Sequence, residues 1–180
     1  MVTSPKEKSA IAGFAAHLTL LEYSIVNHFI CHWKEIPLFM CEGQTHAVTD
    51  VCVVDQWLRP WDPSPCAMDK RHLEQVDPEP QFIAQAIATF QANNSHLQEF
   101  GEDPIHAKTI PGITMISSVP TFYKIPIMQD LVETIETGQY LENQMTVKLV
   151  PPVEGCAQLQ QPLKNRAVIL SCFEAFKQFL

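Results

Sequence analysis

The clearest hydrophobic pattern lies near the N-terminus. Apolar residues recur there at intervals of four, three, four and four, the spacing of one face of a helix: Phe14, Leu18, Leu21, Ile25 and Phe29. The preceding Ser4-Pro5-Lys6-Glu7 combines a capping serine, a first-turn proline and an acid at the third helical position. The pattern predicts a helix from about residue 4 to about Trp33, and Pro37 requires it to end before that position.

Strand-like runs follow this helix. Residues 36–41 and residues 46–54, the latter rich in Val and Thr, flank a Gly-containing four-residue turn and predict a β-hairpin. Residues 109–117 and 121–128 predict a second hairpin, in which prolines mark edges or bulges. Residues 146–150 form a further strand candidate.

Three more helices are predicted, over residues 81–100, 129–137 and 163–180, the second ending at Gly138. Inward-facing positions are expected at Phe82, Ile83, Ala86, Ile87, Phe90, Ile169, Cys172, Phe173 and Phe176. Residues 55–80 contain five prolines and two tryptophans and are expected to be a functional loop or lid. Together the elements predict a single α+β domain over residues 1–180, with two β-hairpins, one further strand and about four helices.

Composition narrows the classes of protein. Of 180 residues, 46% are hydrophobic, which excludes a disordered chain. The net charge is -8 and Lys70-Arg71 is the only adjacent basic pair, so general nucleic-acid binding is disfavoured. No uncharged apolar run is long enough to cross a membrane, and no signal peptide is visible. Six cysteines without a C-x-x-C pair indicate free thiols and a cytoplasmic, intracellular protein.

Histidines on the predicted first helix are the first candidates for chemistry. His28 and His32 are four residues apart, so on a helix both could reach one ligand or metal ion. The sequence lacks the glutamate of H-E-x-x-H, and half-buried histidines with local partners are the favoured interpretation. We therefore expect no bound metal and no cofactor, and keep His28 and His32 as ligand-binding candidates.

The predicted first hairpin and the loop after it supply the other candidates. His46, Asp50 and Asp55 are the candidate catalytic residues, although His46 and Asp50 would lie roughly 13 Å apart on a strand and could only line one cleft. Trp57, Arg59 and Trp61 suit a recognition surface or a lid over a pocket. The alternatives are polar residues at a strand edge and indoles that anchor the loop to the core.

The order of elements also resembles a known family. A helix, a hairpin containing Asp50, a second helix and the runs 110–115 and 122–126 look like the core of the PD-(D/E)XK nuclease-like superfamily, as found in certain mushroom-type fungal proteins. The resemblance implies an Asp opening one strand, which Asp50 matches, and an acidic-x-Lys motif on the next. The nearest match to the motif is 69–71, where Arg71 replaces the lysine, so the resemblance implies a degenerate member that does not cleave nucleic acid.

These observations favour a binding or interaction domain that recognises a protein or small molecule through the hairpin and loop of residues 36–62. The alternative is an enzyme, either an acid–base catalyst of small molecules that uses His and Asp groups or a metal-dependent nuclease. The sequence leaves open the identity of the ligand and whether copies of the chain associate.

Overall fold

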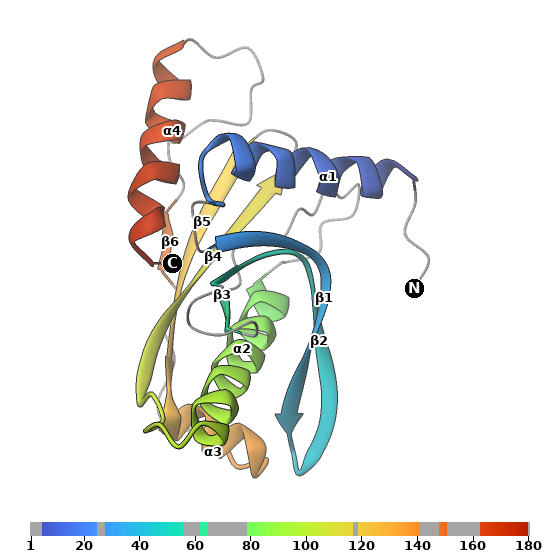
Figure 1. The fold of residues 1–180 in the computed structure, drawn as a ribbon, viewed down its shortest axis with the longest axis vertical. Coiled ribbons are helices and arrows are strands. Elements are labelled where there is room, and N and C mark those ends of the chain that lie inside the picture. The colour runs from blue at the N-terminus through green and yellow to red at the C-terminus, as the bar shows by residue number, and fades with distance from the viewer. Residues whose placement is uncertain are drawn as a thin grey trace.

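The computed structural model describes residues 5–24, 28–55, 62–64, 79–116, 119–140, 148–150 and 163–179. It confirms the α+β fold, and these residues form four α-helices and two three-stranded antiparallel sheets (Figure 1). In chain order the elements are α1 (Pro5–Leu20), β1 (His28–Met40), β2 (Gly43–Asp55), β3 (Asp62–Ser64), α2 (Glu79–Glu99), β4 (Ala107–Ile116), β5 (Val119–Met128), α3 (Gln129–Glu136), β6 (Lys148–Val150), α4 (Leu163–Phe176) and a 3-10 turn (Lys177–Phe179). Sheet A has the strand order β1-β2-β3, and sheet B the order β4-β5-β6.

The first helix is much shorter than predicted. It ends at Leu20, and residues 28–33 form the first part of β1 instead of its last turns. An apolar interval of four also fits a strand, where alternate residues share a face. Aromatic and β-branched residues favour the extended conformation here, and β2 supplies pairing partners along β1 except at Trp33.

The first hairpin is therefore longer than predicted, and its turn is tighter. The two turn residues, Cys41 and Glu42, both have positive φ angles, 50° and 59°, as mirror-image two-residue turns require. Their N–H groups donate to the carbonyls of Ile135 and Glu136, at 2.9 and 2.7 Å. These carbonyls lie at the end of α3, where that of Ile135 also accepts from the Gly138 N–H at 3.2 Å. The turn and the helix end therefore stabilise each other.

The prediction that residues 55–80 form a loop without regular structure is wrong for Asp62–Ser64. These three residues form β3, which pairs antiparallel with the end of β2. Pro63 lies opposite Val54 in this short strand at the edge of the sheet, a position where proline is tolerated. Within this segment, 56–61 and 65–78 fall outside the described residues.

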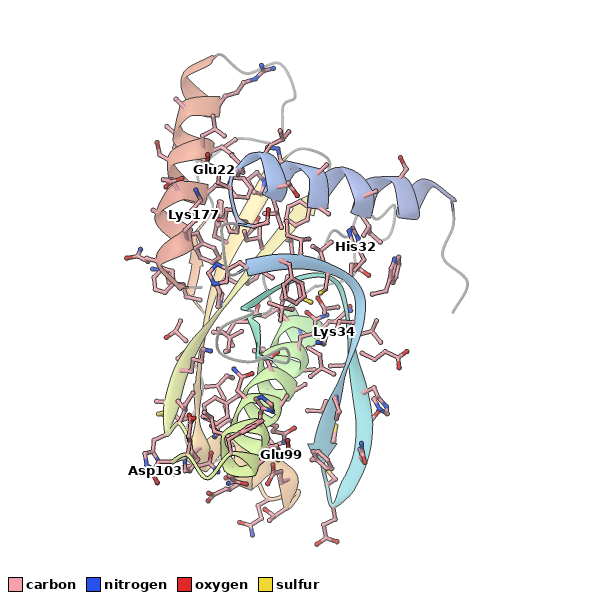
Figure 2. All side chains as sticks on the ribbon, in the orientation of Figure 1. Glu22, His32, Lys34, Glu99, Asp103 and Lys177 are labelled. Carbon is pink, nitrogen blue, oxygen red and sulfur yellow. The ribbon has the colours of Figure 1, made fainter. Side chains whose placement is uncertain are left out.

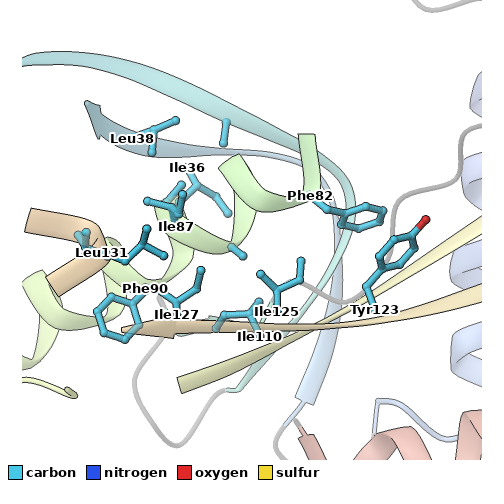
Figure 3. Close-up of a cluster of buried hydrophobic side chains, with 14 residues drawn as sticks. Ile36, Leu38, Phe82, Ile87, Phe90, Ile110, Tyr123, Ile125, Ile127 and Leu131 are labelled. Atoms are coloured by element: carbon cyan, nitrogen blue, oxygen red, sulfur yellow. The ribbon is translucent and has the colours of Figure 1, made fainter. Parts of the chain in front are cut away.

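Helix α2 lies between the two sheets (Figure 3). Ile36 and Leu38 of sheet A contact it from one side, and Ile110, Ile125 and Ile127 of sheet B from the other. It is consequently buried on nearly all sides, including four predicted core positions: Phe82, Ala86, Ile87 and Phe90. A helix in this setting must pair its polar side chains within the protein.

Glycine at position 112 permits a close contact between α2 and sheet B. The ring of Phe82 stacks on Tyr123 with centroids 4.9 Å apart. Gly112 lies opposite Tyr123 in the β4–β5 ladder, and a Cβ atom there would lie 3.1 Å from two ring atoms of Phe82. The absence of a side chain at Gly112 therefore leaves room for the aromatic stack.

A second apolar cluster joins the other face of sheet B to α1, α4 and the end of sheet A. Its central aromatic contacts are Phe122 against Phe173 and Phe176, with centroids 5.1 and 5.0 Å apart. The Tyr23 hydroxyl donates to the carbonyl of Phe173 at 2.6 Å. Both predicted core aromatics of the last helix are buried, and this cluster holds α4 against the rest of the domain. No helix in the described ranges is long and apolar enough to span a bilayer.

Candidate functional site

The strand register of sheet A brings two predicted site residues together with a third. His28 at the start of β1 lies opposite Asp55 at the end of β2, and Asp55 lies opposite Asp62 at the start of β3. The three residues therefore occupy one row across the sheet, which we call the His28 row. An imidazole-bearing residue and two carboxylate-bearing residues at adjacent positions form a combination suited to proton transfer or to cation binding.

The His28 row lies beside the second apolar cluster. Val53 is a fully buried member of that cluster, and Ile30 packs against it. Ile30 and Val53 are paired, two residues along the strands from His28 and Asp55, a separation of about 7 Å. His28 itself is half-buried. Apolar residues of sheet A therefore border the row on the side of this cluster.

The structure separates the other histidines and acids from this row. His46 lies opposite Pro37, nine residues from Asp55 along β2, which corresponds to about 30 Å of strand. Asp50 is half-buried and five residues from Asp55, about 17 Å along the strand. The predicted catalytic group of His46, Asp50 and Asp55 therefore does not form one cluster.

The prediction that His28 and His32 lie four residues apart on a helix is also wrong, because both residues belong to β1. Four residues of strand separate them by about 13 Å, too far for two ligands of one ion. His32 is exposed on the bent hairpin (Figure 2). No group of three or more His, Cys, Asp or Glu side chains that could hold a metal ion occurs among the described residues.

Two groups of residues from the sequence analysis fall outside the described ranges. Trp57, Arg59 and Trp61 belong to residues 56–61, which connect β2 to β3 and hence connect Asp55 to Asp62. Residues 69–71, the counterpart of the acidic-x-Lys motif, are the second group. Asp50, the counterpart of the first acid in the resemblance, lies within β2.

Sequence reasoning missed an unusual polar pair on α2. Asn93 is 4% exposed, yet neither polar atom of its carboxamide has a hydrogen-bond partner in the described part of the chain. The Nε2 atom of His96, one turn later, is likewise buried and without a partner there, while its Nδ1 lies 3.6 Å from Glu99. The regular spacing of Gln85, Thr89 and Asn93 along one helical face was the available clue.

The remaining buried polar groups of α2 are paired. Gln85 Nε2 donates to the carbonyl of Val48 at 2.6 Å, and Gln91 binds both backbone groups of Phe39. Asn94 forms the same two-way contact with Ile105. Asn93 is thus an exception on a helix whose other buried amides are satisfied.

No protein-family model, characterised protein or solved structure matches this chain.

Proposed function

We propose that the protein is a cytoplasmic binding domain that recognises a cationic group of a small molecule or protein at the His28 row. The observation that supports this most is the register that aligns His28, Asp55 and Asp62 across three strands. The site lies at one end of the hairpin and loop of residues 36–62 that the sequence favours for recognition. It therefore narrows that binding region to one end of sheet A.

The charge arrangement gives the reason for a cationic ligand. Directly opposite positions on antiparallel strands place like charges close together, which destabilises the pair. Asp55 and Asp62 occupy such positions, and the chain as a whole carries a net charge of -8. A bound ammonium or guanidinium group would remove this repulsion and form charge-assisted hydrogen bonds.

The connection between the two aspartates adds aromatic residues to the proposed site. Trp57 and Trp61 lie within a six-residue connection whose two ends are joined by the Asp55–Asp62 pairing. Indole faces attract cations, with an energy of about 0.5–2 kcal/mol per contact. In this proposal the two indoles contact the ligand, and the aspartates neutralise its charge.

Acid–base catalysis on a small molecule is the second candidate function. It rests on the same row, because a histidine next to a carboxylate can accept and return a proton. The degenerate nuclease-like interpretation stays a proposal that rests on Asp50 and the order of elements. Turnover of a ligand that binds the row would distinguish an enzyme from a binding domain.

Thermal unfolding with organic cations tests the binding proposal. The probes are tetramethylammonium, butane-1,4-diamine and methylguanidinium, each compared with sodium chloride at equal ionic strength. We expect at least one to raise Tm in the parent, since a ligand that binds only the folded state stabilises it. Asp55→Asn and Asp62→Asn should lose the response, whereas Asp103→Asn, at an exposed site far from the row, should keep it. An equal response in all four proteins would refute the site.

The indoles are tested separately. Trp57→Ala or Trp61→Ala should weaken cation binding and leave Tm nearly unchanged if the indole contacts the ligand. An indole that anchors the loop to the core would instead cost about 3–5 kcal/mol of stability. If both variants melt far below the parent, the indoles are core residues and their part of the proposal fails.

Metal content separates an organic cation from a metal ion as the natural ligand. We expect no stoichiometric zinc or iron in the purified protein. Elemental analysis that finds one metal ion per chain, lost in His28→Ala, would replace the organic cation with a metal in this proposal.

A further inference from the structure

Two cysteines lie opposite each other on the first hairpin. Cys31 of β1 is the register partner of Cys52 of β2, three residues along the strands from the His28 row. Cys31 is half-buried and Cys52 is fully buried, and both are free thiols. Partners in a ladder have neighbouring side chains, so the hairpin holds the two thiols together.

Hydrogen bonding elsewhere in the hairpin shows whether Cys31 and Cys52 exchange backbone hydrogen bonds with each other. Antiparallel pairs alternate between those that exchange backbone hydrogen bonds and those that do not. Both backbone groups of Phe39 bind the carboxamide of Gln91 at 2.9 Å, so they point away from β2 and the Phe39–Gln44 pair is of the second kind. Pro37 is two residues from Phe39, so its pair with His46 is also of the second kind. Proline fits there because it has no N–H group to donate to the partner strand.

The alternation extends to the cysteines. The ladder skips Trp33, whose φ is 53°, and Asp50, but its register is the same on both sides of this position, so no extra residue is inserted in either strand. Phe39 and Cys31 are separated by an even number of positions. The Cys31–Cys52 pair is therefore also of the kind without backbone hydrogen bonds. The Cα atoms of such pairs lie about 4.5 Å apart, within the range of about 4.4–6.8 Å that a disulfide spans.

The surroundings give the two thiols different reactivities. Burial, together with the neighbouring Cys31, raises the pKa of Cys52 to about 12, and Lys34 opposes this shift only in part. Cys52 is thus held as a thiol at neutral pH. Cys31 is the more accessible of the two, so a reagent from solution meets it first.

We propose that Cys31 and Cys52 are a thiol–disulfide exchange site that takes low-molecular-weight disulfides such as oxidised glutathione. The Cys31 thiolate attacks one sulfur of the reagent, forms a mixed disulfide and releases one reduced thiol. Cys52 then attacks the Cys31 sulfur, and its proton passes to the departing sulfur, which leaves as the second reduced thiol. Two protein thiols are oxidised, one reagent disulfide is reduced, and the product is a Cys31–Cys52 disulfide.

The other described cysteines lack this arrangement and provide the control. Cys41 lies in the hairpin turn against Gly138, with its sulfur 3.5 Å from the Cβ position of that glycine, and Cys172 packs beside the second apolar cluster. Neither pairs with a cysteine in the strand ladders that the structure describes. Cys172→Ser is the matched control variant.

The test is mass spectrometry of the folded chain after incubation with excess oxidised glutathione and quenching with an alkylating agent. We expect a loss of about 2 Da, with fragment ions that link Cys31 to Cys52. Dithiothreitol should reverse it, Cys172→Ser should react equally, and Cys31→Ser should leave Cys52 reduced. Glutathione retained on Cys31, a link between other cysteines, or no reaction would each overturn the proposal.

Discussion

Gln91 should be one of the most important polar residues for stability, although it carries no charge. Its side chain is 5% exposed and lies between α2 and the open edge of β1. Its Oε1 accepts from the Phe39 N–H, and its Nε2 donates to the Phe39 carbonyl and to Glu136 Oε1, all at 2.9 Å. The carboxamide thus occupies the place of a neighbouring strand and ends the sheet at that position.

Replacing Gln91 with Leu removes these three hydrogen bonds while keeping a similar volume. A typical hydrogen bond contributes about 0.5–1.5 kcal/mol net, and each buried group left without a partner costs about 1–3 kcal/mol. Two backbone groups of Phe39 would lose their partner in partly buried surroundings. We therefore expect Gln91→Leu to lower the free energy of unfolding by about 3–4 kcal/mol, between these limits.

Urea denaturation followed by circular dichroism measures this change through the midpoint at constant slope. Gln98→Leu is the matched control, because Gln98 is exposed on the same helix and should change stability by less than about 0.5 kcal/mol. If Gln91→Leu and Gln98→Leu unfold at the same urea concentration, the contact between α2 and the strand edge does not stabilise the fold.

Four further substitutions test the packing, the buried polar groups and the pH dependence of stability. Gly112→Ala should lower the free energy of unfolding by about 1–3 kcal/mol in the same denaturation assay, because its Cβ would lie 3.1 Å from the Phe82 ring. Gly13→Ala should raise it by about 0.5–1 kcal/mol, because Gly13 lies in α1 with open space around its Cβ position. Asn93→Leu should leave stability unchanged or raise it, since no hydrogen bond of Asn93 within the described residues is lost; a lower Tm would contradict this. Burial lowers the pKa of His17 below 6.5, so the unfolded chain binds the proton more readily and stability should fall as pH drops below about 6.5. His17→Gln should remove that component from the pH dependence of Tm, and an unchanged profile would exclude it.

Elements with a distinct local pattern were predictable from the sequence. Helix α2 and the short α3, which ends at Glu136 just before Gly138, lie close to their predicted positions. The two strands of the second hairpin likewise lie close to their predicted positions. In each case the spacing of apolar residues, or a proline or glycine, marks the element in the local sequence.

Other elements depend on distant partners and were not predictable. Residues 28–33 carry an apolar spacing that fits a helix or a strand, and only pairing with β2 selects the strand. β3 is three residues long and exists through its contact with the end of β2.

The same limit applies to the candidate site. His28 and Asp55 were each predicted as site residues, but their pairing with Asp62 depends on a register that spans 35 positions of sequence. Asn93 is buried because α2 lies between two sheets, an arrangement that helix periodicity does not reveal.

An NMR titration of the parent protein with the organic cation that raises Tm most is the most direct test of the proposed function. We predict saturable shifts of the backbone amides of His28, Asp55 and Asp62, with changes in the indole N–H signals of Trp57 and Trp61. Asp62→Asn should weaken the fitted affinity by about tenfold or more, the loss of about 1.4 kcal/mol or more that one charge-assisted contact represents. Shifts confined to surfaces away from the His28 row, or no saturable shift with any of the three cations, would contradict the proposed function.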